Sequence, residues 1–174
     1  MNKITELELA IYLIDLPNRG KCLKLLRDNK SRFEESPGSL TKHQAWKGGY
    51  VDHLNETMQL AVLFYGITNP RRKHPFKIGD VMLILFLHDL EKPWKYIEPK
   101  MHFESDLDKE VFINGLIDKY KIILTPAHKN ALKYIHGEGD DFSPTERIQG
   151  PLAAFCHICD VFSARIWFNY PEYD

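Results

Sequence analysis

The sequence predicts an all-α protein, a single-domain bundle of helices, and three observations support this fold class. Apolar residues recur every three to four positions in successive segments, which is the spacing of one helix face. No segment shows the apolar and polar alternation of a half-buried strand. Two segments carry specific helix-start signals, because Ser105 is a good N-cap and Thr125-Pro126 combines a cap with proline at the first helical position.

The first 40 residues are expected to form helices that pack on the rest of the domain. Residues 4–16 show helical apolar spacing, and Pro17 to Gly20 interrupts them. Residues 22–33 mark a second helix, whose lysine and arginine side is expected to face water. A Ser-Pro-Gly-Ser run at 36–39 ends this pair of helices.

The longest apolar run of the chain is expected to be a buried core helix. Seven apolar residues, 81–87, lead directly into His88 and Asp89. The run is too short to cross a membrane, which requires about 20 residues. We expect the helix to begin at 79–80 and to end or kink just before Pro93. It is preceded by a helix over 51–65, which follows a glycine pair and ends at Gly66.

Three helices are predicted in the remaining sequence. The first spans 106–121 after the Ser105 cap, and the second spans 126–136 and ends at Gly137. A loop over 140–150 then leads to a last long helix over 152–168.

Composition limits the possible function classes. The 174 residues suit one domain, and 44% hydrophobic and 12% aromatic residues are ordinary for a globular protein. A net charge of −1 provides no overall field for nucleic acid or membrane. The first 16 residues lack the basic start of a secretory signal. Three cysteines without a framework spacing favour a reducing compartment, so we expect a cytoplasmic protein that does not bind membranes.

Several histidines and aspartates fall on the apolar sides of the predicted helices. Such residues are costly to bury unless they are paired or bound to a metal. Imidazole and carboxylate together suit Zn, Fe, Mn, Ni or Co rather than Ca. The sequence therefore predicts a centre for a divalent transition metal, and its candidate ligands are His53, His88, Asp89, His136 and Asp160.

The order of these residues resembles the HD-domain superfamily of metal-dependent phosphohydrolases. The resemblance covers about residues 43–170 and is closest in motif to the HD domain of 3′–5′ exoribonucleases, through the segments 43–53, 135–138 and 160–165. It implies a helical bundle with the metal at its centre, and residues 1–40 packed on that core. It also implies that the first metal is held by His53, His88, Asp89 and Asp160.

Many relatives in this superfamily hold a second ion, and two positions would serve it here. One is His136, and the other falls on or near Glu110, where relatives have histidine. Glutamate is a competent oxygen ligand, so one or two ions are expected. A second departure is Glu91, where relatives often have glycine, whereas Lys92 is retained.

The resemblance implies hydrolysis of a phosphomonoester or phosphodiester, from a nucleotide or a short nucleic acid. Asp89 would hold the metal and orient its water, and Lys92 would neutralise charge on the phosphoryl oxygens. Surface pairing of Lys92 with Glu91 or Glu56 is the alternative. Further side chains are candidates for binding the substrate: His43, Arg72, Lys73, Arg147 and Arg165.

Other interpretations remain open at this level. A solvated connector is the favoured interpretation of the loop that holds Arg72 and Lys73, and a phosphate-facing rim is the alternative. Arg165 is equally a salt-bridge partner. The same ligand set occurs in di-iron oxygenases of the HD fold, and a non-catalytic domain that binds a metal or nucleotide is a further alternative. Cys156 and Cys159 are expected on the core side of the last helix rather than in a zinc knuckle. His128 is expected at a solvated helix start.

Overall fold

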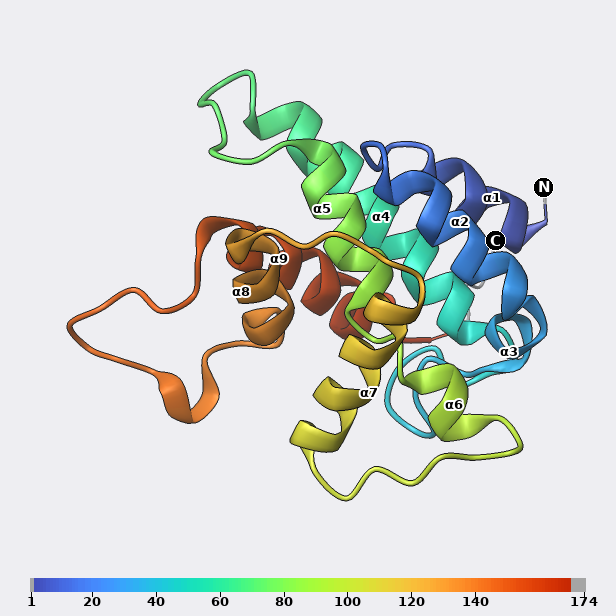
Figure 1. Cartoon of the computed structure of the whole chain (residues 1–174). Coiled ribbons are helices and arrows are strands. Elements are labelled where there is room, and N and C mark those ends of the chain that lie inside the picture. The colour runs from blue at the N-terminus through green and yellow to red at the C-terminus, as the bar shows by residue number, and fades with distance from the viewer. Residues whose placement is uncertain (1, 170–174) are drawn as a thin grey trace.

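Every regular element is a helix in residues 2–169, the part of the chain that the computed structural model describes (Figure 1). The elements are α1 (Lys3–Ile11), α2 (Asn18–Asp28), α3 (Lys30–Glu35), α4 (Gly49–Thr68), α5 (Ile78–Leu87), α6 (Lys92–Tyr96), α7 (Asp106–Lys119), α8 (Pro126–Tyr134), the short 3₁₀ helix η1 (Gly139–Asp141) and α9 (Pro151–Ile166). The predicted all-α class is confirmed. Met1 and the predicted end of the domain, 170–174, lie outside the described residues.

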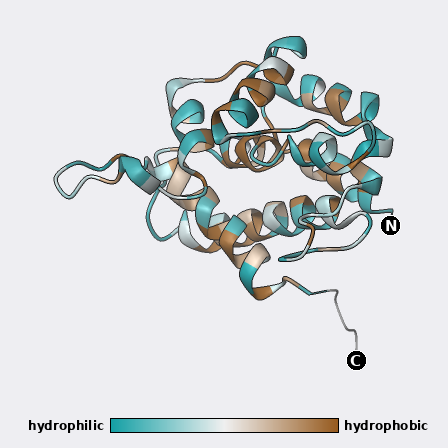
Figure 2. Ribbon diagram, turned by 90° about the horizontal axis from the view of Figure 1, so that it is seen from below, coloured by the Kyte–Doolittle hydropathy of each residue, from teal (hydrophilic) through white to brown (hydrophobic). Residues whose placement is uncertain are grey.

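The centre of the bundle is α5, which contacts α1, α4, α8 and α9. All residues from Val81 to Leu87 are buried, because this helix is apolar on every side and has no face suited to water. Each large side chain buried in this way stabilises the fold by roughly 1.5–3 kcal/mol. Figure 2 shows hydrophobic residues on the inner faces of the bundle and hydrophilic residues on its outside.

The helices α4 and α5 run antiparallel, and α9 packs against both of them (Figure 1). Their connecting loop, 69–77, projects from one end of the bundle. The start of α4 and the end of α5 meet at the other end. The helix α8 packs against both α5 and α9, so it joins α4, α5 and α9 around the centre of the bundle.

Several helix ends differ from the prediction. The predicted helix over 22–33 is divided at Asn29, whose side-chain amide donates to the carbonyl of Leu25 at 2.8 Å and ends α2. The first helix ends at Ile11 and not at residue 16. Gly66 does not end α4, which continues to Thr68.

The central helix ends earlier than Pro93 indicated. Its last residue is Leu87, and His88 is the C-cap. Pro93 instead lies in the first turn of α6, where backbone N–H groups have no hydrogen-bond partner within the helix, so the missing N–H of proline costs nothing. The turn between α5 and α6 carries Asp89. No helix in the range 2–169 has the length and apolar character needed to cross a membrane.

The two predicted capping signals are confirmed. Ser105 Oγ accepts from the N–H of Asp108 at 3.2 Å, and α7 begins at the next residue after Ser105. Thr125 Oγ1 accepts from the N–H of His128 at 3.2 Å, and α8 begins at Pro126. These ends are local features, because each depends on residues within one turn.

Candidate metal centre

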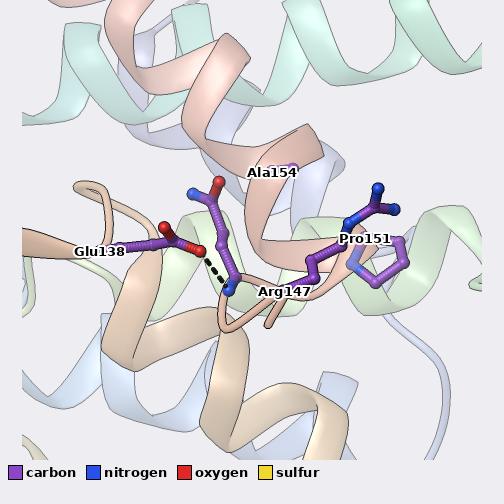
Figure 3. Close-up of a pocket in the computed structure, with 5 residues that line it drawn as sticks. Glu138, Arg147, Pro151 and Ala154 are labelled. Atoms are coloured by element: carbon purple, nitrogen blue, oxygen red, sulfur yellow. Dashed lines mark hydrogen bonds between the residues drawn. The ribbon is translucent and has the colours of Figure 1, made fainter. Parts of the chain in front are cut away.

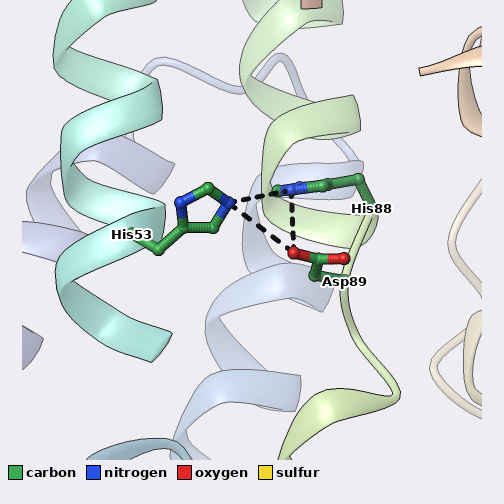
Figure 4. Close-up of side chains that lie close together, drawn as sticks. All are labelled: His53, His88 and Asp89. Carbon is green, nitrogen blue, oxygen red and sulfur yellow. Dashed lines mark hydrogen bonds and ion pairs between the residues drawn. The ribbon is translucent and has the colours of Figure 1, made fainter. Parts of the chain in front are cut away.

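Two imidazoles and a carboxylate meet between α4 and the end of α5 (Figure 4). His53 lies near the start of α4, and its side chain has no exposed area. Its Nε2 atom is 3.3 Å from Nε2 of His88. Asp89 Oδ2 lies 3.2 Å from the His88 nitrogen and 3.6 Å from that of His53.

The helix α9 and the segment after α8 complete this cluster. Asp160 Oδ1, from α9, is 3.2 Å from His53 Nε2 and 3.7 Å from His88 Nε2. His136 follows the end of α8, and its Nε2 lies 3.7 Å from Asp89 Oδ1 and 3.7 Å from Asp160 Oδ2. Its side chain is 58% exposed, so it stands at the open side of the cluster. The structure thus brings these five predicted ligands together.

The backbone orients His88 toward the cluster. Its Nδ1 lies 2.7 Å from the carbonyl oxygen of Leu85, which can only accept a hydrogen bond. Nδ1 therefore carries a proton, and in the neutral ring the lone pair is on Nε2. That lone pair is directed at the carboxylates of Asp89 and Asp160.

The charges in the cluster are suited to a bound cation. Burial lowers the pKa of His88, but Asp89 and Asp160 outweigh this effect and raise it to about 10. Burial likewise raises the pKa of Asp89, yet Lys92 and His88 hold it well below its usual range. Burial also lowers the pKa of His53 to about 4. Two ionised carboxylates thus draw a proton onto His88, and a divalent ion can replace that proton.

The spacing of the donor atoms fits one ion. Zinc lies about 2.0–2.2 Å from nitrogen or oxygen ligands, so ligands of one ion lie about 3–3.5 Å apart. In the set His53, His88, Asp89 and Asp160, the two histidine nitrogens lie 3.3 Å apart, and each lies 3.2 to 3.7 Å from a carboxylate oxygen of Asp89 and of Asp160. The donor atoms of His53, His88 and Asp89 all lie within 4.8 Å of one another. A second set of donors, from His88, His136 and Asp160, also lies within 4.8 Å. Mixed nitrogen and oxygen ligands suit a first-row transition metal.

A recess of about 600 Å³ opens above the cluster and carries positive charge on its rim. Lys42, Lys92 and Arg165 line it, together with the predicted substrate-binding residue His43. The remaining lining residues are Asp89, His136, His157, Asp160, Val161 and Ala164. Cations around a recess whose floor carries the candidate ligands favour an anionic ligand.

Lys92 is part of this centre and not a surface residue. Its Nζ lies 2.5 Å from Asp89 Oδ2, and its side chain is only 11% exposed. Its ion pair is therefore with Asp89. Glu91, one of the surface partners considered for Lys92, is itself buried. Its burial and the nearby charge of Asp89 raise the pKa of Glu91 to about 7.

Glu110 is not brought to the cluster. Its side chain is exposed on α7, where Leu107 and Val111 are also 66% and 63% exposed. Only the C-terminal part of this helix is buried, through Leu116 and Ile117. The apolar residues of α7 do not form one continuous buried stripe, and the structure does not support Glu110 as a ligand.

Arg72 and Lys73 are also distant from the centre. They lie in the loop after α4, at the end of the α4–α5 pair that is opposite to the cluster (Figure 1). From His53 to the end of α4 at Thr68 the helix rises by roughly 22 Å. The exposed positions of both side chains agree with a solvated connector, and the structure does not support them as substrate-binding residues.

Arg147 lines a second, neighbouring hollow of about 450 Å³ (Figure 3). In this hollow the Glu138 carboxylate accepts a hydrogen bond from the backbone N–H of Gln149 at 2.7 Å. The guanidinium of Arg147 extends toward Pro151, away from Glu138 (Figure 3). Arg147 is not among the residues that line the recess above the metal centre.

Sequence reasoning missed Lys42 and His157 in the lining of the recess. His157 precedes Asp160 by three residues on α9, so helical spacing alone could have placed both on one face. No comparable signal marks Lys42, because it lies in a loop. Cys156 and Cys159 are both buried and free, as expected for core residues.

His128 does not lie in solvent, contrary to expectation. It is buried in the first turn of α8, and its Nε2 lies 3.0 Å from Asp80 Oδ1. Because its Nδ1 accepts from the N–H of Thr125, Nε2 donates to Asp80 and links α8 to α5. No local pattern indicates this contact, because Asp80 and His128 are 48 residues apart in the sequence.

Comparison with protein-family models, with curated proteins and with solved structures found no match for the chain. The case for function therefore rests on the residues and their geometry. A helical bundle with a buried His and Asp group is compatible with an HD domain.

Proposed function

We propose that the protein is a metal-dependent phosphohydrolase of the HD type, which acts on a phosphomonoester or phosphodiester. One observation carries the proposal: two imidazole nitrogens and two carboxylates converge beneath a recess with a cationic rim. The ion-binding residues would be His53, His88, Asp89 and Asp160. A divalent Mn, Fe, Ni, Co or Zn ion, when bound, supplies Lewis acidity toward water and a phosphoryl oxygen.

The two oxygens of Asp89 have different surroundings, which suggests different roles. Oδ2 faces Lys92 and His88 at 2.5 and 3.2 Å. In residues 2–169, the charged partner of Oδ1 is the more open His136, at 3.7 Å. Oδ1 is therefore placed to accept a hydrogen bond from the attacking water and orient it.

Lys92 and Arg165 would bind the phosphoryl group from the rim. A recess of about 600 Å³ is within the usual range for a small-molecule site and suits a nucleotide. The Lys92 ammonium would stabilise negative charge that grows on the phosphoryl oxygens during the reaction. His43, also in the lining, would contact the remainder of the substrate.

His136 is the group available for a second ion. Its Nε2 lies equally far, 3.7 Å, from Asp89 Oδ1 and Asp160 Oδ2. With Glu110 in solvent, a second ion would have fewer protein ligands than the first. We therefore propose one tightly held ion and a weaker second one.

Metal analysis and a substrate screen together test this function. The protein is purified anaerobically without chelator, and its metal content is measured. Nucleoside mono-, di-, tri- and cyclic phosphates are then tested with Mn, Co, Ni and Fe. We expect release of phosphate or cleavage of the diester by the wild type, and loss of both metal and turnover in Asp160→Ala. Asp118→Ala, at an exposed position on α7, is the matched control and should behave as wild type.

Each alternative gives a different result in the same experiment. Turnover that consumes O₂ in an iron-loaded, coloured protein would identify the di-iron oxygenase. Bound metal without turnover of any phosphate ester would favour the non-catalytic domain. Equal absence of metal from the wild type and Asp160→Ala would remove the metal centre itself.

A further inference from the structure

A buried chain of hydrogen bonds lies behind His53, on the side away from the recess. His53 Nδ1 is 2.9 Å from Ser163 Oγ, and Ser163 Oγ is 2.6 Å from Glu56 Oε2. His53 and Ser163 are both fully buried. Glu56 lies one turn after His53 on α4, and Ser163 lies one turn after Asp160 on α9. The chain therefore joins the two helices that carry these ligands.

A fourth residue, Gln44, holds the end of this chain in place. Its Nε2 donates to Glu56 Oε2 at 2.7 Å and to the backbone carbonyl of Trp167 at 2.8 Å. Because the Trp167 carbonyl can only accept a hydrogen bond, the Gln44 amide must direct its nitrogen, and not its oxygen, toward Trp167 and Glu56. Gln44 is fully buried, so its amide is held in this orientation.

These contacts give the chain a direction. An ionised Glu56 accepts hydrogen bonds and donates none, so the single hydroxyl hydrogen of Ser163 is directed to it. The Ser163 oxygen then accepts from Nδ1–H of His53. This arrangement leaves the lone pair of neutral His53 on Nε2, the atom that faces Asp160 and His88.

Two carboxylates thus compete for the proton of His53. Asp160, 3.2 Å from Nε2, would draw the proton to that atom and block metal binding there. Glu56, acting through Ser163, favours the proton on Nδ1. Groups that hydrogen-bond to the outer nitrogen of a ligating histidine commonly change metal affinity 10- to 100-fold.

We propose that Glu56 is a positioning residue of the metal centre, which acts through Ser163 to keep the Nε2 lone pair of His53 available to the ion. The inference rests on the proposed metal centre. Glu56 is neither one of the candidate ligands nor among the residues that line the recess.

The test combines Co²⁺ affinity with the protonation pattern of His53. Co²⁺ binding is measured by competition with a chelator. In the metal-free protein, ¹⁵N NMR shows which ring nitrogen of His53 carries the proton. We expect Nδ1–H in the wild type, and Glu56→Leu and Ser163→Ala should each weaken Co²⁺ binding 10- to 100-fold. Glu56→Leu should also give a detectable Nε2–H form.

Four further variants separate positioning from a merely structural effect. Ser163→Thr keeps the hydroxyl and should bind Co²⁺ as wild type. Glu56→Gln keeps an acceptor oxygen for Ser163 and should lose less affinity than Glu56→Leu. In the Ser163→Ala background, Glu56→Leu should add no further loss, because the chain is already broken. Glu35→Gln removes a glutamate paired with Lys47 on the surface and is the matched control.

The outcomes distinguish this inference from the proposed function. Wild-type Co²⁺ affinity in Glu56→Leu, with Nδ1–H retained, would overturn the role of Glu56 and leave the metal centre standing. If the wild type binds no Co²⁺, the proposed metal centre is wrong. If His53 of the wild type carries its proton on Nε2, the role of Glu56 is overturned whether or not Co²⁺ binds. If Glu56→Leu does not fold, Ser163→Ala and Glu56→Gln decide the same question.

Discussion

The ammonium of Lys92 is held against Asp89 and faces the recess, and its loss should separate chemistry from metal binding. We expect Lys92→Ala to keep the metal, because Lys92 is not a ligand, and to lose mainly kcat. Removal of one such donor typically costs about 10²- to 10³-fold in rate. Asp89→Asn should lose metal and activity together. Metal analysis and steady-state kinetics on the identified substrate check both expectations.

Lys100→Ala provides the control for this pair, since Lys100 is exposed and its ion-pair partner in the described part of the chain is Glu98. It should show wild-type kinetics. Near-normal turnover of Lys92→Ala would remove Lys92 from the mechanism, and its contact with Asp89 would then be structural.

A second prediction for single residues concerns the thiol of Cys22. Burial raises its pKa from the ordinary 9.0 to about 12, with a small opposing effect of Lys21. The folded protein therefore keeps this proton above pH 9, whereas the unfolded chain releases it. Folding stability should fall as pH rises from about 9 toward 12. At pH 8 a thiol reagent should not modify Cys22 in the folded protein, and should modify it rapidly in denaturant. Rapid modification without denaturant would show that the thiol is accessible.

Among the helices, α4 offers two glycines with opposite expected effects. A Cβ atom on Gly49 would lie 1.9 Å from the carbonyl oxygen of Gln44, so the backbone would have to move. A Cβ on Gly66 would have no heavy atom within 4 Å, and this glycine is exposed within the helix. Gly66→Ala should stabilise the protein by about 0.5–1 kcal/mol through helix propensity.

Gly49→Ala should instead destabilise it by about 1–3 kcal/mol, the usual cost of overpacking. It should also weaken metal binding. The clash would displace the backbone of Gln44, whose side chain holds Glu56 by a hydrogen bond. Thermal melts of the two variants against wild type measure the stability gain of Gly66→Ala and the stability loss of Gly49→Ala. Equal melting temperatures for the two variants would contradict the close contact at Gly49.

For the whole molecule, we expect metal binding to stabilise the fold. The candidate ligands come from α4, from the ends of α5 and α8, and from α9, so a bound ion would link the central helices. A ligand at 100 times its Kd adds about 2.7 kcal/mol to stability. In a chain of this size, such a gain raises Tm by roughly 5–11 °C. Calorimetry with added Co²⁺, and then with chelator, should show the rise and its reversal.

Asp160→Ala gives the comparison for this measurement. It should melt at the same temperature with and without Co²⁺. An equal rise in the variant would show that the ion acts elsewhere on the protein.

The sequence by itself determined those features that depend on near neighbours. Helical spacing and the caps at Ser105 and Thr125 act within one or two turns, so the all-α class and these two helix starts could be predicted. The apolar run of α5 required burial, because no side of it suits water. Histidine and aspartate beside buried faces were costly enough to indicate a partner, and His53, His88, Asp89, His136 and Asp160 do lie together.

Only the tertiary structure decided which other side chains share that centre. Glu110 lies in solvent because α7 packs through its last turns, and Arg72 lies at the far end of a helix pair whose other end holds the cluster. Glu56 and Ser163 are 107 residues apart and meet only because α4 packs on α9. Helical periodicity shows which residues share a face, but the packing of distant helices decides what that face meets.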